Sequence, residues 1–230
     1  MTSTSAGPRA GLISTDPQAS VLTWLNRVKD PIPAFPFRQV ASSAEFKETV
    51  DEMQQAGIVR IFVDTPGSLR DEELLLATLE HTDDIVVPLV AEDLALGATA
   101  RTMKEVFLPS GLPYRLVVNG IDPRDGTNDL EQARKWIDKR GWLRVNTYVR
   151  RYKFISHMPG TGMLITRLQP NRNAHNARQD ISDLALELGF GHHHGRPLVT
   201  AIANQKGGVG KTTIAVQLAA KINEVLGGGS

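Results

Sequence analysis

A glycine-rich run late in the 230-residue chain has the composition of a phosphate-binding loop. Its residues are Lys206, Gly207, Gly208, Val209, Gly210, Lys211, Thr212 and Thr213. An apolar run at 198–203 precedes it and a helical pattern follows, which is the strand–loop–helix setting that such a loop needs. Glycines let backbone N–H groups converge on phosphate oxygens, and the helix start adds unpaired donors. We therefore predict a nucleotide site, with an ordinary glycine-rich turn as the alternative.

Within this run, side chains of two types could act on a nucleoside triphosphate. The Lys211 ammonium is expected to contact the β- and γ-phosphates, and the Thr212 hydroxyl to bind Mg²⁺. Asp64 follows the apolar run 59–63, and an aspartate at the carboxyl end of a buried strand can reach a Mg²⁺-bound water beside such a loop. The alternative for Asp64 is a turn residue at a strand end.

The elements that must position these residues alternate along the chain. Short β-branched or apolar runs lie at 10–14, 35–39, 59–63, 84–89, 115–119, 143–148 and 198–203. Helical patterns lie at 43–55, 69–81, 94–106, 129–139, 177–188 and 211–225. This alternation predicts an α/β fold, a doubly wound and mostly parallel sheet with helices on both faces. Prolines near 35–39 favour an edge position for that strand.

Composition narrows the classes of protein that fit. Hydrophobic residues make up 41% and charged residues 22% of the chain, as in ordinary globular domains. The chain contains no cysteine, which excludes disulfides and thiolate metal sites. No apolar run approaches the roughly 20 residues of a membrane span, and the first residues lack the apolar core of a signal peptide. We expect a cytoplasmic protein.

The charges are distributed unevenly. Residues 134–178 hold eleven Lys or Arg and a single acid, Asp138, although the whole chain has a net charge of only +1. A local excess of this kind indicates a surface for a polyanion, with a solvated face as the alternative.

The glycine-rich run resembles the deviant Walker A motif of the ParA/MinD family of P-loop NTPases. This resemblance implies that Lys206 reaches across an ATP sandwich homodimer to the partner's nucleotide, much as an arginine finger does. Outside the motif, Lys206 would be an ordinary solvated lysine. The segment Asp16-Pro17-Gln18 resembles the family's Asp-Pro-Gln segment, which implies that Asp16 positions the attacking water and the metal shell. The alternative is a turn aspartate before proline.

The implied catalytic residues are thus Lys206, Asp16 and Lys211, and the implied metal residues are Thr212, Asp16 and Asp64. Ser14 stands where family members usually carry another aspartate, which puts the contacts around the metal and the hydrolysis rate in doubt. Asn119 ends the strand at 115–119, and the resemblance implies that its amide recognises adenine. A simple turn asparagine is the alternative.

The basic window resembles the family's C-terminal region, which implies non-specific DNA binding through phosphate contacts. The residues nominated are Arg150, Arg151, Lys153, Arg167, Arg172 and Arg178. The near absence of acids in the window argues against salt bridges within it.

The order of the motifs differs from that of the family, in which the phosphate loop comes first. Moving 196–226 to the front restores the family order. We therefore predict one circularly permuted domain: 1–190 from the Asp-Pro-Gln strand to the last helix, 191–195 as connector, 196–226 as loop strand and helix, and 227–230 as a tail. The alternatives are a truncated second domain or pairing of the last segment in trans. The three histidines at 192–194 supply no fixed metal geometry, so a connector or tag remnant is expected.

The function expected from this resemblance is that of a DNA-partition ATPase using ATP and Mg²⁺. Its expected partners are a second copy, non-specific DNA and a ParB-like centromere-binding activator, with no membrane, and its expected place is the nucleoid. Alternatives are a MinD-like membrane-surface switch, which the acids Asp180, Asp183 and Glu187 on the helix at 177–188 argue against, and a nucleotide-binding module without turnover. An electron-transfer relative is disfavoured because its cluster needs cysteines.

Overall fold

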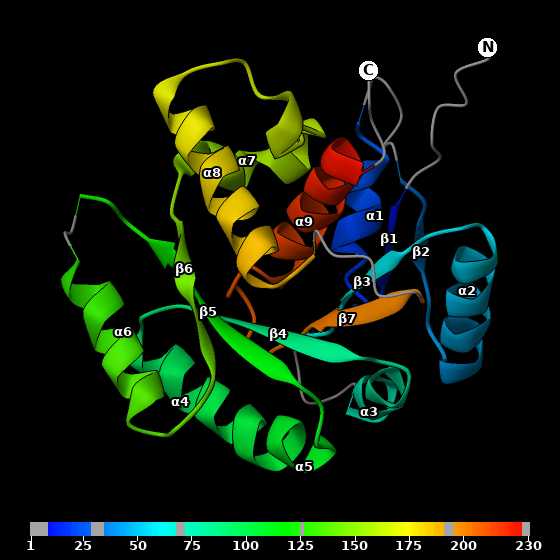
Figure 1. The fold of residues 1–230 in the computed structure, drawn as a ribbon, viewed down its shortest axis with the longest axis horizontal. Helices are drawn as coiled ribbons and strands as arrows, with labels where there is room; N and C mark the ends of the chain where they lie inside the picture. Colours follow the sequence, from blue (N-terminus) through cyan, green and yellow to red (C-terminus); the bar gives the residue numbers. More distant parts are fainter. Residues whose placement is uncertain (1–8, 29–34, 68–71, 125–126, 191–195, 227–230) are drawn as a thin grey trace.

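The computed structural model describes residues 9–28, 35–67, 72–124, 127–190 and 196–226. Seven parallel strands form one sheet (Figure 1). They are β1 (Ala10–Ser14), β2 (Phe37–Gln39), β3 (Arg60–Asp64), β4 (Asp84–Leu89), β5 (Tyr114–Ile121), β6 (Arg144–Arg150) and β7 (Leu198–Ile202). The spatial order is β2-β1-β3-β7-β4-β5-β6, so the last strand of the sequence lies at the centre. The predicted edge position of β2 is confirmed.

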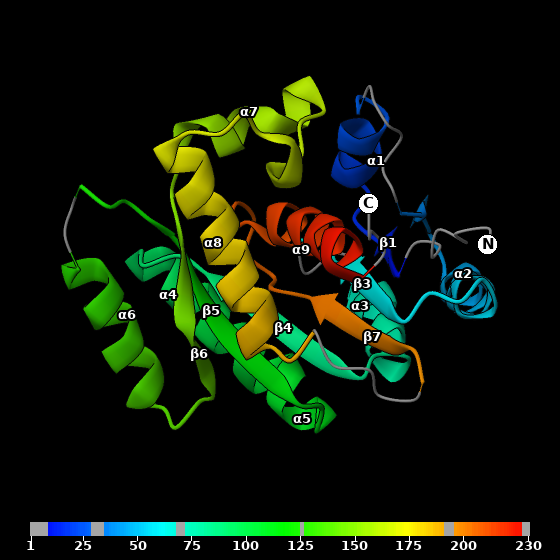
Figure 2. The same ribbon diagram turned by 45° about the horizontal axis from the view of Figure 1, so that its top comes forward.

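Helices cover both faces of this sheet, which confirms the predicted α/β class (Figure 2). One face carries α1 (Ser20–Leu25), α7 (Lys153–Thr161), α8 (Arg172–Glu187) and α9 (Lys211–Leu226). The other carries α2 (Ser43–Gln55), α3 (Glu72–Glu80), α4 (Asp93–Thr102) and α6 (Asn128–Asp138). The central strands are buried on both sides, and Ile61, Phe62 and Val63 are all 0% exposed. Both helix layers therefore pack apolar side chains against the sheet.

Several helix bounds differ from the sequence expectation. The helix expected at 94–106 ends as α4 at Thr102 and continues as a π-helical turn, Met103–Phe107, and the short α5 (Leu108–Ser110). The helix expected at 177–188 starts earlier, at Arg172, because the Asn171 side chain caps it by accepting from the Ala174 N–H. Residues 69–71 of the helix expected at 69–81 lie outside the described residues. The helices α1 and α7 were not predicted.

The carboxyl ends of the central strands are joined by hydrogen bonds from the residues that follow them. The Thr15 N–H donates to the Asp64 carbonyl at 2.9 Å, and the Thr65 hydroxyl donates to the Ile202 carbonyl at 3.1 Å. The loops after β1, β3 and β7 therefore start side by side at one edge of the sheet. In parallel α/β sheets this edge is where ligands bind.

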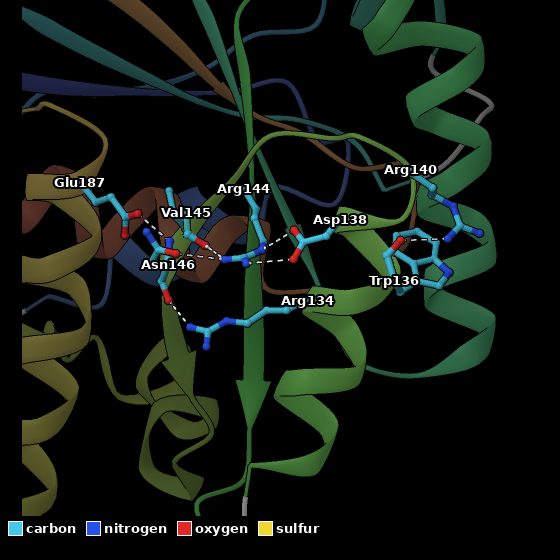
Figure 3. A network of polar contacts seen from close by, with 8 residues as sticks. All are labelled: Arg134, Trp136, Asp138, Arg140, Arg144, Val145, Asn146 and Glu187. Atoms are coloured by element: carbon cyan, nitrogen blue, oxygen red, sulfur yellow. Dashed lines mark hydrogen bonds and ion pairs between the residues drawn. The ribbon is translucent and has the colours of Figure 1, made fainter.

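The edge strand β6 is covered by side chains of neighbouring helices (Figure 3). The Glu187 carboxylate accepts from the backbone N–H groups of Asn146 at 2.5 Å and Thr147 at 2.8 Å, and the Arg134 guanidinium donates to the Asn146 carbonyl. Arg144 forms a two-pronged ion pair with Asp138. These contacts satisfy backbone groups that would otherwise offer a pairing edge to another strand.

The first described residues are held by the last helix. The Asn223 side chain of α9 is buried, and its Oδ1 accepts from the N–H groups of Arg9 at 2.6 Å and Ala10 at 3.0 Å. Its Nδ2 donates to the Ala10 carbonyl at 3.0 Å. Residues 9 and 223 are thus in direct contact although they lie 214 positions apart.

Candidate functional site

The glycine-rich loop leaves the central strand β7 at the carboxyl edge of the sheet and runs into α9. Gly208 and Gly210 have φ values of 77° and 92°, in the left-handed region that favours glycine. A Cβ atom on Gly210 would lie 2.1 Å from Nδ2 of Asn119, so this position also has no room for a side chain. Gly207 and Gly208 are exposed and Val209 is fully buried, which anchors the loop while its glycines face outward.

Three side chains hold the loop in shape. The Lys211 ammonium donates to the Lys206 carbonyl at 3.2 Å, and Asn119 Nδ2 donates to the Val209 carbonyl at 2.8 Å. Asn204 Oδ1 accepts from the Lys206 N–H at 3.1 Å. The loop is therefore preformed. Sequence reasoning missed Asn204, whose only signal was its place two residues before Lys206.

Lys211 is 7% exposed, and burial lowers the pKa of its ammonium, while the nearby charges of Asp64 and Asp16 raise it. Gly67, which follows β3, leaves the space that this side chain uses. A Cβ on Gly67 would lie 3.0 Å from Lys211 Nζ and 3.3 Å from the Gly207 Cα. Sequence reasoning did not single out Gly67.

Asp64 and Thr212 meet where β3 ends and α9 begins. The Thr212 hydroxyl donates to Asp64 Oδ2 at 2.7 Å, and Asp64 is 0% exposed. Its Oδ1 is also buried and has no hydrogen-bond partner among the described residues. Burial raises the pKa of Asp64 to about 7, against the opposing effects of the Thr212 hydrogen bond and the Lys211 charge.

These oxygens suit a hard divalent cation. A carboxylate oxygen without a partner, beside a hydroxyl, is the kind of donor set that Mg²⁺ takes. Among the described residues, no group of three or more His, Asp or Glu side chains could hold a metal ion. A cation bound here would therefore complete its shell with water and phosphate oxygens, which is usual for Mg²⁺ at nucleotide sites.

Asp16 follows β1 and lies near Asp64 and Lys211, since its charge acts on the pKa of both groups. Its backbone carbonyl accepts from Gln39 Nε2 at 2.9 Å, and its Oδ1 accepts from the Gln18 N–H at 3.0 Å. Ser14, at the position where an aspartate was expected from the resemblance, is buried, and its hydroxyl accepts from the Asp16 N–H at 3.4 Å. Ser14 thus supports the turn that presents Asp16.

Most of the predicted site residues line a cleft with two lobes that share the loop glycines, whereas Asp64 and Val209 are buried behind it. One lobe, about 460 Å³, is lined by Asp16, Gly67, Lys211, Thr212 and Thr213 together with those glycines. The other, about 470 Å³, is lined by Asn119, Asp122, Arg151, Tyr152, Ile155 and Lys206 among others. The first lobe is rich in phosphate- and metal-binding groups, and the second has the mixed apolar and polar lining typical of sites for organic ligands.

The six nominated basic residues divide into two kinds. Arg150 forms an ion pair with the buried Asp180 at 2.5 Å, and Arg178 donates to the carbonyls of Ile165 at 3.0 Å and Leu168. Arg151, Lys153 and Arg172 are exposed, and Arg167 is half-buried in the 3₁₀ turn Ile165–Arg167.

The expectation that salt bridges within the basic window are unlikely is wrong for one pair, Arg144 and Asp138. Arg150 is paired by an acid that follows the window in sequence but lies on the facing helix α8, and Arg144 pairs with Asp138 inside the window. The guanidinium groups of Arg150 and Arg178 thus bind groups of the protein itself.

Comparison with known proteins shows similarity to a curated relative. No protein-family model matches the chain. Over 183 residues the chain is 28% identical to the maintenance of carboxysome distribution protein A of Gloeobacter kilaueensis, covering 80% of this chain and 82% of that protein. Among the described residues, none of the helices has the length and apolar character needed to cross a bilayer.

Proposed function

We propose that this chain is a ParA-like ATPase that positions cargo, and that it binds and hydrolyses ATP in the two-lobed cleft. The observation that carries the proposal is the 2.7 Å hydrogen bond from Thr212 to the buried Asp64, directly beside the preformed glycine loop. This arrangement couples a phosphate cradle to a metal-binding carboxylate, as nucleotide hydrolysis requires. The similarity to a carboxysome distribution protein supports a positioning role.

The triphosphate occupies the lobe that contains Lys211 and Thr212, and the base occupies the lobe that contains Asn119. Loop N–H groups from Gly207 to Thr213 hold the phosphates, while Lys211 offsets charge on the terminal pair. The Nδ2 group of Asn119 donates a hydrogen bond to the Val209 carbonyl. Its Oδ1 accepts no hydrogen bond from a described residue. That free acceptor suits the 6-amino group of adenine, whereas guanine would present an oxygen there.

Thr212 and Asp64 would hold Mg²⁺, with Asp16 nearby, and the bound ion would supply charge that neutralises the phosphates. Asp16 also orients the attacking water, from the lobe that it lines together with Lys211 and Thr212. Lys206 lines the second lobe of the cleft and is partly exposed, and its ammonium has no hydrogen-bond or ion-pair partner among the described residues. We assign it the deviant Walker A role, in which it contacts the nucleotide of a second copy and makes the homodimer depend on ATP.

The ATP-bound dimer binds non-specific DNA through exposed cations on and beside α7 and α8, namely Arg151, Lys153 and Arg172. A ParB-like activator would release it by stimulating hydrolysis, so that the protein cycles on the nucleoid. The cargo is a plasmid, a chromosome or another large body, such as the carboxysome in the relative's name.

We further propose that the chain is a circular permutation of this family. The strand before the loop is last in sequence yet central in the sheet, and Asn223 binds the first described residues directly. A cut between α9 and β1 would leave these contacts intact, because the residues on either side of the cut are already neighbours.

The deciding experiment is sedimentation mass with ATP and Mg²⁺, with ADP, and without nucleotide, each with and without duplex DNA. We expect an ATP-specific dimer that binds DNA and is lost in Lys206→Ala. Phosphate release measured on the same samples separates turnover from mere binding. A monomer under all conditions, with no phosphate release, would refute the ATPase switch.

A further inference from the structure

The residues that lead into the glycine loop are tied to α4 by hydrogen bonds. Asn204 is 1% exposed, and its Nδ2 donates to the Pro88 carbonyl at 2.8 Å and to the Thr99 hydroxyl at 2.9 Å. Its Oδ1 accepts from the Lys206 N–H at 3.1 Å. The next residue, Gln205, contacts α4 as well, since its Oε1 accepts from the Thr102 hydroxyl at 3.3 Å.

The surroundings fix the orientation of the Asn204 amide. Pro88 offers only a carbonyl, which must accept, and Lys206 offers an N–H, which must donate. The Thr99 hydroxyl donates its own proton to the Ala95 carbonyl at 2.8 Å, so its oxygen faces Asn204 as an acceptor. A flipped amide would place like groups against each other on both sides. Asn204 therefore has one hydrogen-bonding state, with its oxygen on Lys206.

Lys206 is held by its backbone on both sides. Asn204 binds its N–H and Lys211 binds its carbonyl, while the Lys206 ammonium has no partner among the described residues. The direction in which this side chain leaves the loop is therefore determined by its two peptide groups. A small error in the direction of the Lys206 side chain would lower the hydrolysis rate, because a contact with the transition state requires accurate placement.

We propose that Asn204, oriented by Thr99 of α4, is a positioning residue for Lys206. It acts through the Lys206 backbone, so that the ammonium points toward the nucleotide of a second copy. This inference rests on the proposed function, because it assumes that Lys206 acts on the γ-phosphate. It adds a role for α4, which contributes no side chain to the phosphates themselves.

The test combines single-turnover hydrolysis, which resolves slow residual rates, with ATP affinity. We expect Asn204→Ala to lower the hydrolysis rate about tenfold, the size expected when one positioning hydrogen bond is lost. Its dissociation constant for ATP should stay within about twofold, since Lys211 and Thr212 still hold the phosphates. Thr99→Val removes the acceptor on α4, together with the hydrogen bond from Thr99 to the Ala95 carbonyl, and should give a smaller loss, about threefold. It is the second variant if Asn204→Ala fails to fold.

A double variant separates positioning from general structure. In a Lys206→Ala background, Asn204→Ala should cause no further loss, because the group it positions is gone. Asn223→Ala is the matched control. It removes a buried asparagine that also binds backbone groups, but at the start of β1, away from the carboxyl ends of the strands where the loop lies. It should lower the unfolding temperature and leave the rate of the folded protein within about twofold.

Other outcomes would overturn the inference. A full further loss in the double variant, a parallel loss of ATP affinity, or an unchanged rate in both Asn204→Ala and Thr99→Val would each show that Asn204 does not act through Lys206. Failure of the proposed function has a different signature, since the unaltered chain itself would then release no phosphate, whereas an undiminished rate in Lys206→Ala would refute only the role assigned to Lys206.

Discussion

Thr212 and Asp64 lie 148 residues apart in the sequence, yet the Thr212 hydroxyl donates a 2.7 Å hydrogen bond to the Asp64 carboxylate. The contact joins the start of α9 to the end of β3, because β7 is inserted beside β3 in the sheet. It leaves the second carboxylate oxygen buried and without a partner among the described residues. The most specific predictions concern this pair.

Replacing Thr212 should lower the affinity for Mg²⁺ strongly and should change the free energy of unfolding only slightly. Loss of a group that orients a metal ligand typically costs about 10- to 100-fold in metal affinity. We expect that range for the Mg²⁺ concentration that half-saturates hydrolysis in Thr212→Ala. Thr212→Ser keeps the hydroxyl and should stay close to the original chain. Equal Mg²⁺ dependence in the two variants would contradict the assignment.

Asp64 should make the metal-free protein less stable at high pH. Its pKa is about 7 in the folded protein against an ordinary 3.8, so between these values the folded state keeps a proton that the unfolded state has lost. Stability therefore falls as pH rises from about 4 to about 7, and the cost is constant above that range. At about 1.4 kcal/mol per pKa unit, the cost is at most about 4 kcal/mol.

Asp64→Asn removes this charge and should raise the free energy of unfolding at pH 8. The difference from the original chain should disappear below about pH 4, where both states of Asp64 are protonated. Denaturant unfolding in the presence of EDTA measures it directly. If Asp64→Asn is less stable than the original chain at pH 8, burial does not dominate at this carboxylate.

Much of this site could be predicted from sequence because local patterns encode it. The strands β1 and β4 match their predicted ranges, and the loop glycines that need positive φ lie in a motif. Non-local contacts could not be predicted. The pairing of Arg150 with Asp180 depends on α8 packing against β6, and α7 was missed because Pro159 and Gly160 interrupt its short pattern. Asn204 was missed because its partner Thr99 lies 105 residues away.

Two glycines that face the loop have too little room for a Cβ atom unless their neighbours shift. Gly210→Ala would meet Asn119 Nδ2 at 2.1 Å and retain a φ of 92°, and Gly67→Ala would press on Lys211 Nζ at 3.0 Å. We expect both to lower ATP affinity at least about tenfold, since each displaces a group that shapes the loop. Gly97→Ala in α4 has open space around its Cβ and should leave affinity unchanged while adding up to about 1 kcal/mol of stability. Isothermal titration with a non-hydrolysable ATP analogue would show whether the three differ as stated.

The neighbouring arginines 150 and 151 should behave in opposite ways. Arg151→Ala should weaken binding to duplex DNA at every sequence and reduce the salt dependence by about one phosphate contact, without changing stability. Arg150→Ala leaves the buried Asp180 without its charged partner, although the backbone N–H of residue 150 still donates to it, and should cost about 3 kcal/mol of folding free energy. DNA titrations at several salt concentrations, paired with thermal melts, distinguish the two. Loss of DNA binding by a fully stable Arg150→Ala protein would reverse this assignment.

Reordering the chain should preserve the fold and the site. In the reordered protein, residues 196–226 come first and residues 9–190 follow. A short Gly/Ser linker joins residue 226 to residue 9, and the new chain ends lie at residues 196 and 190. Because Asn223 already contacts residues 9 and 10, the linker closes a short gap, and the entropy of closing a loop grows only slowly with its length. We expect the unfolding midpoint to change by only a few degrees and ATP affinity to stay within about threefold. Asn223→Ala should destabilise both orders by similar amounts. A reordered protein that loses ATP binding while remaining folded, or that forms dimers regardless of nucleotide, would show that the present order is required for the site.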